Sequence, residues 1–265
     1  MKSNKIFFKN SKFLPVDKFF KNVLYDKKFG YYSSRIPFGK KGDYITSPKI
    51  SFLFSEIISV WIIACWESFG KPKTFNIVEL GPGDGSLTCT LLRSFKKFPE
   101  FNSIKKIFLI EESKYLKKVQ KKKISNKDVK WINNLNKIKK GPVIFFGNEF
   151  FDAIPIKQYL FNNNKFRERV VSIDQQNNLT FESIEVNSDH LSISNREIEY
   201  PINGQLYELS PMQDTMLEKI FSKIQNNGGL LVIDYAKTNG PSGDTLQALS
   251  KHKKVSIFHK PGESD

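Results

Sequence analysis

The stretch "NIVELGPGDGSL", residues 76–87, decides the expected fold of the chain. A mainly apolar run leads into Glu79, and three glycines follow at a spacing of two: Gly81, Gly83 and Gly85. An apolar run that stops at clustered glycines predicts a buried strand, a tight turn and a helix after it. Glycine accepts positive φ angles and allows a close approach to the backbone. The turn is therefore expected to lie against a ligand.

The glycine spacing separates this turn from the common phosphate-binding turns. A dinucleotide-binding fingerprint needs a third glycine five residues after the first, and that position is Ser86. A P-loop would end in Gly-Lys-Ser or Gly-Lys-Thr, whereas residues 85–87 are Gly-Ser-Leu. The carboxylate of Glu79 disfavours a phosphate and favours a cation or a hydrogen-bond donor. S-adenosylmethionine offers a sulfonium, an ammonium and a ribose diol, so it is the expected cofactor. The alternative is a turn that only packs a helix on a strand.

Short apolar runs alternate with helical patterns along most of the chain. Strands are expected at about 75–80, 104–112, 128–132, 141–150 and 228–236, and helices at about 13–29, 51–69, 85–97, 113–123, 210–226 and 244–252. This alternation predicts an α/β fold with a mostly parallel sheet and helices on both faces. Ligands of such sheets bind beyond the carboxyl ends of the strands. Glu111 follows the second strand and is expected to hold the ribose hydroxyls.

Five stretches resemble the MidA-like methyltransferases, a family that includes the mitochondrial complex I assembly methyltransferase. They are "FGYYSSRIPFGKKGDYITSPKISFLFSE" (29–56), "VELGPGDGSL" (78–87), "GNEFFDAIPIKQY" (147–159), "GGLLVIDYA" (228–236) and "GDTLQALSKH" (243–252). The resemblance implies the Rossmann-like, three-layer fold of class I methyltransferases and S-adenosylmethionine as the donor. In the mitochondrial branch it implies arginine methylation of a core subunit of respiratory complex I. It also implies that a C-terminal part of the family domain is missing, because the family continues beyond the counterpart of residues 261–265.

Two regions are expected along the chain. Residues 1–70 are predicted to form a helical and loop extension over the cofactor site, and residues 71–265 are predicted to form the methyltransferase domain. Short β-type runs separated by asparagine-rich turns predict an inserted β-hairpin region over about 157–205.

The residues expected to bind the cofactor form two groups. The first group surrounds the glycine turn: Glu79, Gly81, Pro82, Gly83, Gly85 and Glu111. The second group lies in the Gly-, Pro- and Ser-rich loop at 30–50, which could fold over the donor: Gly42, Asp43, Thr46, Ser47 and Pro48. The alternative for the second group is an ordered turn that caps the helix at 51–69.

Asn148, Glu149 and Asp152 follow the fourth strand and are the candidate catalytic residues. An acceptor arginine arrives protonated, because the pKa of its side chain is above about 12. Carboxylates must then hold the guanidinium and help to remove a proton, which are the roles expected of Glu149 and Asp152. Asn148 could orient the acceptor. The alternatives are a helix N-cap for Asp152 and a solvated loop acid for Glu149. Asp234 lies at the end of another strand, and the sequence does not decide between a packing role and a catalytic role for it.

The formal net charge of +15 favours a nucleic-acid methyltransferase as the alternative function. However, 37 of the 42 basic residues are lysines spread along the chain, which indicates a bias of composition. A protein substrate, with complex I as the candidate, is therefore preferred over a specific nucleic acid. A further alternative is a non-catalytic assembly factor that retains the fold.

The remaining features limit cofactors and location. His190, His252 and His259 are scattered, and Cys65 and Cys89 form no CxxC pair, so no metal is expected. No apolar run reaches the ~18 residues of a membrane span, so no membrane insertion is expected. The lysine-rich start has neither the apolar region of a signal peptide nor the arginines of a presequence. The expected location is a bacterial cytoplasm, with the mitochondrial matrix as the alternative.

Overall fold

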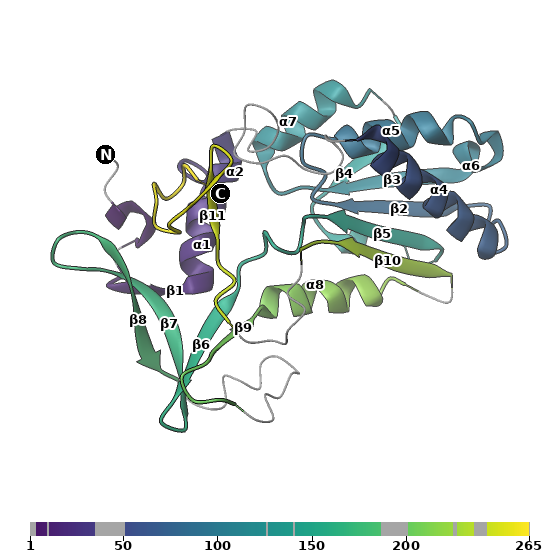
Figure 1. Ribbon diagram of the computed structural model, residues 1–265. Coiled ribbons are helices and arrows are strands. Elements are labelled where there is room, and N and C mark those ends of the chain that lie inside the picture. Colours follow the sequence, from purple (N-terminus) through teal and green to yellow (C-terminus); the bar gives the residue numbers. More distant parts are fainter. Residues whose placement is uncertain are drawn as a thin grey trace. The chain divides into compact units, whose positions relative to one another are not determined.

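The computed structural model of the chain (Figure 1) describes residues 4–9, 11–34, 51–125, 127–139, 141–186, 201–224, 227–235 and 243–264. The chain divides into two compact units. The parallel-sheet unit comprises Arg35–Asp152 and Met216–Tyr235, and the antiparallel unit comprises Met1–Ser34, Ala153–Thr215 and Ala236–Asp265. The predicted boundary at residue 70 separates the segment expected to cover the cofactor from the expected methyltransferase domain, and this division stays a prediction.

Five parallel strands form the sheet of the parallel-sheet unit, in the order β10-β5-β2-β3-β4. Their bounds are Phe75–Leu80 (β2), Lys105–Ile110 (β3), Val129–Ile132 (β4), Val143–Asn148 (β5) and Gly228–Ile233 (β10). The central strand β2 places Leu80 opposite Ile110 of β3 and Gly147 of β5. The carboxyl ends of these three strands therefore lie side by side, and the predicted α/β class with a parallel sheet is confirmed.

Helices cover both faces of this sheet, because its strands are apolar on both sides. The helices are α4 (Phe52–Ser68), α5 (Ser86–Phe95), α6 (Pro99–Ile104), α7 (Lys114–Lys123) and α8 (Pro211–Phe221), with a 3-10 turn, η2 (Leu135–Lys137). Figure 1 shows α4, α5 and α6 on one side of the sheet and α8 on the other. Along β2 the side chain of Ile77 enters the core under α4 to α6, and that of Val78 enters the opposite core with Ile220 of α8.

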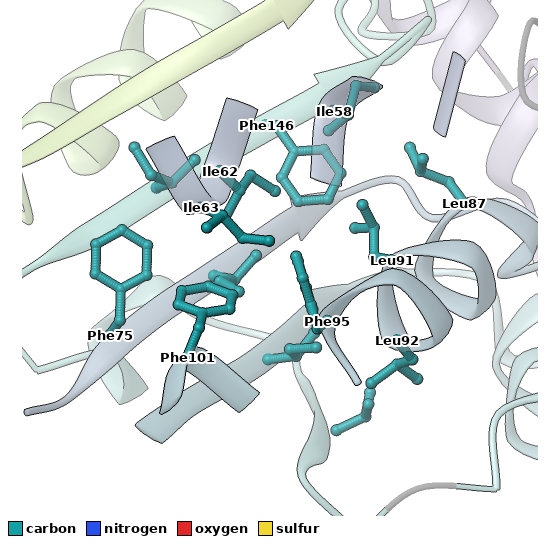
Figure 2. Close-up of a cluster of buried hydrophobic side chains, with 14 of the residues drawn as sticks. Ile58, Ile62, Ile63, Phe75, Leu87, Leu91, Leu92, Phe95, Phe101 and Phe146 are labelled. Carbon is teal, nitrogen blue, oxygen red and sulfur yellow. The ribbon is translucent and has the colours of Figure 1, made fainter. Parts of the chain in front are cut away.

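Aromatic rings fill much of the core under α4 to α6 (Figure 2). Phe75, Phe95 and Phe101 have no exposed surface, and the ring of Phe101 meets the other two edge-on at 5.9 and 5.0 Å. Removing each such ring from water contributes roughly 2–3 kcal/mol to stability. This core fixes α5, and with it the turn that joins β2 to α5.

The antiparallel unit contains a second sheet. Its strands are β1 (Phe13–Pro15), β6 (Lys157–Asn162), β7 (Lys165–Ile173), β8 (Leu179–Glu185) and β9 (Leu206–Leu209), and β7 pairs with β1, β6 and β8. The other elements are η1 (Asn4–Phe7), α1 (Val16–Tyr25), α2 (Tyr31–Ser34) and the hairpin of β11 (Ala248–Ser250) with β12 (Lys253–Val255). The buried side of α1, with Val16, Phe19 and Val23, packs with Val171 of β7.

Two sequence-based expectations for this unit are wrong. No helix forms over 244–252: residues 248–250 are β11, which pairs with β12, and Lys251 and His252 lie in the turn between the strands with φ angles of 52° and 63°. Such angles suit a two-residue hairpin and exclude a helix. The predicted helix at 13–29 begins at Val16, because Pro15 is extended and pairs with Val170. Among the helices that the structure describes, none has both the length and the apolarity of a membrane span.

Candidate functional site

The turn from Gly81 to Gly85, called the glycine turn below, joins β2 to α5. Its three glycines have φ angles of 61°, 55° and 78°. A Cβ atom at Gly81 would lie 2.6 Å from Cδ2 of Phe150, and one at Gly85 would lie 2.8 Å from Cδ1 of Ile124. Both positions therefore exclude side chains by conformation and by space. The N–H of Gly85 donates to the carbonyl of Pro82 at 2.8 Å, which closes the turn.

Glu79 lies inside the sheet just before the glycine turn, and its side chain is buried. Its Oε2 accepts a hydrogen bond from the hydroxyl of Thr88 in α5. The pKa of Glu79 is raised to about 7, mainly by burial, with the hydrogen bond from Thr88 opposing the rise and the carboxylates of Asp84 and Glu111 adding to it. A buried acid of this kind gains stability in its ionised form when a cation approaches.

Glu111 follows β3 directly, and Ser113 and Gln120 donate hydrogen bonds to its two carboxylate oxygens. Its Oε1 accepts the N–H of Ser113 at 2.8 Å, and its Oε2 accepts Nε2 of Gln120 at 3.1 Å. Burial raises the pKa of Glu111. The same Nε2 of Gln120 donates to the carbonyl of Gly83 at 2.7 Å, so Glu111 lies beside the glycine turn as the sequence predicts.

Gln120 was not among the predicted site residues. Its side chain is fully buried, and its position in α7 shares one face with Leu116 and Ile124, at spacings of four residues. A glutamine on the apolar stripe of an otherwise lysine-rich helix was the signal that could have identified it, because a buried amide needs partners.

The turn from Asn148 to Asp152, called the carboxylate turn below, follows β5. Glu149 has a φ of 50°, and its N–H donates to the carbonyl of Ile233 in β10 at 2.8 Å. Oδ2 of Asp234 accepts the N–H groups of Phe151 at 2.8 Å and Asp152 at 3.2 Å. Asp234 therefore fixes the backbone of this turn, which gives it a structural role.

The side chains of the carboxylate turn differ in exposure. Asp152 is exposed, and no helix lies between β5 and β6, so the N-cap alternative for Asp152 is wrong. Nδ2 of Asn148 donates to Oε1 of Glu149 at 3.3 Å. Within the described part of the chain, Oδ1 of Asn148 is buried and has no hydrogen-bond partner. A buried acceptor in this state is suited to an N–H group of a ligand.

The two turns are in contact. β2 and β5 are neighbours in the sheet, and the ring of Phe150 fills the space beside Gly81 that a Cβ would occupy. The structure thus brings together Glu79, the glycine turn, Glu111 and the carboxylate turn at the carboxyl edge of the sheet. The predicted residues Gly42, Asp43, Thr46, Ser47 and Pro48 lie outside the described residues.

Residues 57–265 match the profile of a protein family described as "Putative S-adenosyl-L-methionine-dependent methyltransferase". The chain belongs to this family. S-adenosylmethionine, the cofactor that the sequence favours, is also the cofactor in the family's description. The family and the geometry agree, because a glycine turn flanked by acids suits this cation better than a phosphate.

Curated relatives of this chain carry the name "Protein arginine methyltransferase NDUFAF7, mitochondrial". The protein of Homo sapiens is 30% identical over 279 residues, which cover 95% of this chain and 62% of the relative. The protein of Xenopus tropicalis is 29% identical over 280 residues, which cover 95% of this chain and 64% of the relative. The chain therefore spans less than two thirds of the length of these relatives.

A solved structure from Burkholderia thailandensis, bound to S-adenosyl-homocysteine, shares the fold of this chain. The TM-score is 0.81 at 21% sequence identity, and the match covers 96% of this chain and 68% of that one. A native crystal structure from the same organism gives a TM-score of 0.77 at 20% identity. The predicted methyltransferase fold is confirmed by this likeness.

Proposed function

We propose that this protein transfers a methyl group from S-adenosylmethionine to an arginine side chain of a protein partner. The observation that carries the proposal is the contact between the two turns, where Phe150 of the carboxylate turn packs on Gly81 of the glycine turn. A site for a cationic donor and a group of acceptor-binding side chains are thereby neighbours at one edge of the sheet. The chemistry that the donor supplies is a methyl group on a sulfonium.

The residues present fit this donor. The positive φ angles of Gly81, Gly83 and Gly85 give a tight turn that adds no side chains of its own, and Phe150 and Ile124 pack against it. Glu111 would hold the ribose hydroxyls, because its two oxygens retain acceptor capacity beyond the bonds from Ser113, Gln120 and the backbone of Glu112. The buried carboxyl of Glu79, with its pKa raised to about 7, lies just before the turn and would provide negative charge when a bound cation favours its ionised form. This arrangement supports a cationic ligand and disfavours a phosphate.

The carboxylate turn supports a guanidinium acceptor. A guanidinium is a planar fork of N–H donors, and carboxylates and amide oxygens are its natural acceptors. Oδ1 of Asn148 is a buried acceptor without a partner among the described residues, and Glu149 and Asp152 supply charge beside it. We assign acceptor orientation to Asn148, guanidinium binding to Glu149 and assistance in proton removal to Asp152.

The partner and location follow from the relatives as proposals. The curated relatives are named as mitochondrial protein arginine methyltransferases, which supports a protein substrate and the mitochondrial matrix rather than a bacterial cytoplasm. The family resemblance adds a core subunit of respiratory complex I as the partner. We propose that subunit as the first substrate to test.

The test is a methylation assay with the full-length protein, S-adenosylmethionine labelled in its methyl group and an isolated complex I core subunit. Mass spectrometry is expected to locate the label on an arginine, and the subunit with that arginine replaced by lysine should remain unlabelled. Label on lysine would contradict the proposed acceptor. Stable capture of the subunit without methyl transfer would instead indicate an assembly factor, and an absence of saturable donor binding would contradict the donor site.

A further inference from the structure

We propose that Gln120 is a positioning residue that sets the carboxylate of Glu111 for the ribose hydroxyls of the donor. The inference rests on the proposed donor site and goes beyond it, because Gln120 itself would not touch the donor. Its amide joins the glycine turn, the acid after β3 and the indole of Trp131 in β4.

Every hydrogen-bonding group of the Gln120 amide has a partner on a different element. Nε2 donates to the carbonyl of Gly83 at 2.7 Å and to Oε2 of Glu111 at 3.1 Å. Oε1 accepts the indole N–H of Trp131 at 2.8 Å. The side chain is fully buried, so water does not compete for these bonds. Hydrogen bonds in a buried network reinforce each other. The amide of Gln120 therefore links the glycine turn, Glu111 and β4.

The partners also fix which way the amide faces. An indole N–H is only a donor, so it requires the oxygen of Gln120. The carbonyl of Gly83 and the carboxylate of Glu111 are acceptors, so they require the nitrogen. A rotation of the amide by half a turn would set oxygen against oxygen at Gly83 and Glu111. Trp131 therefore selects the orientation that draws Glu111 toward the glycine turn.

The consequence is a carboxylate that is oriented before any ligand arrives. Ser113 holds Oε1 of Glu111 and Gln120 holds Oε2, so the plane of the carboxylate has two anchors. The oxygens remain able to accept the two hydroxyls of a ribose diol, which is the part of the donor that distinguishes it from a deoxyribose analogue. A loss of Gln120 should therefore act mainly on ribose recognition.

The decisive experiment measures binding by calorimetry in the full-length protein and in Gln120→Met, a variant of similar volume that cannot hydrogen-bond. The ligands are S-adenosylhomocysteine and its 2′,3′-dideoxyribose analogue. The variant is expected to bind S-adenosylhomocysteine about 10- to 100-fold more weakly and the dideoxyribose analogue less than about threefold more weakly. Lys118→Met, on the exposed side of the same helix, is the matched control and should leave both affinities unchanged.

If the binding of both ligands is weakened equally, Gln120 has a merely structural role and the inference is overturned. Unchanged binding of S-adenosylhomocysteine would also overturn it. If the unaltered protein binds neither ligand, the proposed donor site fails, and this result is distinct from the other two. Circular dichroism and the midpoint of thermal unfolding establish that Gln120→Met is folded.

A second variant keeps the core ring while removing the group that orients the amide. Trp131→Phe lacks the indole N–H, so Oε1 of Gln120 loses its donor and the amide is held only through the bonds of Nε2 to Gly83 and Glu111. We expect about a three- to tenfold loss for S-adenosylhomocysteine, and no further loss when Trp131→Phe is added to Gln120→Met. Full additivity of the two variants would contradict the proposal that Trp131 acts through Gln120.

Discussion

The glycine turn and the carboxylate turn end neighbouring strands of one sheet, yet they are held in place in different ways. The glycine turn is fixed by its own backbone and by the helices that follow it: Gly85 bonds to Pro82, and Lys123 of α7 pairs with Asp84 at 3.1 Å. The carboxylate turn is fixed from outside, because its N–H groups bond to Asp234 after β10. The glycine turn is thus closed by its own backbone and a nearby helix, whereas the carboxylate turn depends on an acid that follows another strand.

This difference separates the kinds of change that each turn should tolerate. The glycine turn has no space for an added side chain at Gly81 or Gly85. A substitution in this turn that removes a charge without changing the size of the side chain should leave its backbone nearly unchanged. The carboxylate turn presents an exposed acid, Asp152, on a backbone that other groups hold. Replacing only its charge should leave the structure and alter the chemistry.

Gly81→Ala is expected to have the largest effect. An alanine at a φ of 61° costs about 1 kcal/mol, and the 2.6 Å approach to the ring of Phe150 adds roughly 1–3 kcal/mol. Unfolding in denaturant should show a loss of about 2–4 kcal/mol, and calorimetry should show little donor binding. Gly70→Ala is the matched control, because Gly70 also has a positive φ of 81° but open space around it. Similar losses in both variants would contradict the steric argument.

Asp152→Asn tests the other half of the comparison. The variant keeps the shape of an exposed side chain and removes its charge, so donor affinity should remain within about twofold. Methyl transfer should slow by about 10²-fold, the scale of a positioned acid–base group. Single-turnover rates with the labelled donor would measure this loss. Full activity in Asp152→Asn would refute the assigned role and leave proton removal to Glu149 or to solvent.

The same difference explains what the sequence could reveal. The glycine turn and Glu79 lie within ten residues, and the strands are apolar runs bounded by turn residues, so local pattern was sufficient for the parallel sheet. The contacts of Gln120 with Gly83 and of Asp234 with Phe151 span 37 and 83 residues, and no local pattern contains them. The hairpin of β11 and β12 was missed for a related reason. Leu246, Gln247 and Ala248 favour a helix locally, but pairing with the next strand prevails.

Glu111→Ala sharpens the view of the glycine turn as a preformed site. Loss of a charge-assisted bond to the ribose should weaken donor binding by about 1.5–3 kcal/mol, which calorimetry can resolve. The neighbouring Glu112 is exposed, so Glu112→Ala provides a control at the same end of β3. The control should bind the donor normally. An unchanged affinity in Glu111→Ala would remove this residue from the site.

The smallest expected effect concerns the buried acid of the glycine turn. In the unfolded chain Glu79 releases its proton near the ordinary value of 4.5, whereas burial raises its pKa to about 7 in the folded protein. Between these values the folded state holds the extra proton, so the contribution of Glu79 to stability is complete below pH 4.5 and falls as the pH rises through 7. Between pH 6 and pH 8 the loss should be about 1 kcal/mol.

Glu79→Gln isolates this contribution, because a glutamine oxygen can still accept the hydroxyl of Thr88 while no proton is exchanged. Chemical denaturation at pH 6 and pH 8 should show a smaller fall in stability for the variant than for the unaltered protein. A cationic ligand favours the ionised carboxylate, so donor binding below pH 7 should also release a fraction of a proton, seen in calorimetry as a dependence on the ionisation enthalpy of the buffer. This release should vanish in Glu79→Gln. Equal pH dependence in both proteins would mean that Glu79 is already ionised in the free protein, and that shape alone defines the glycine turn.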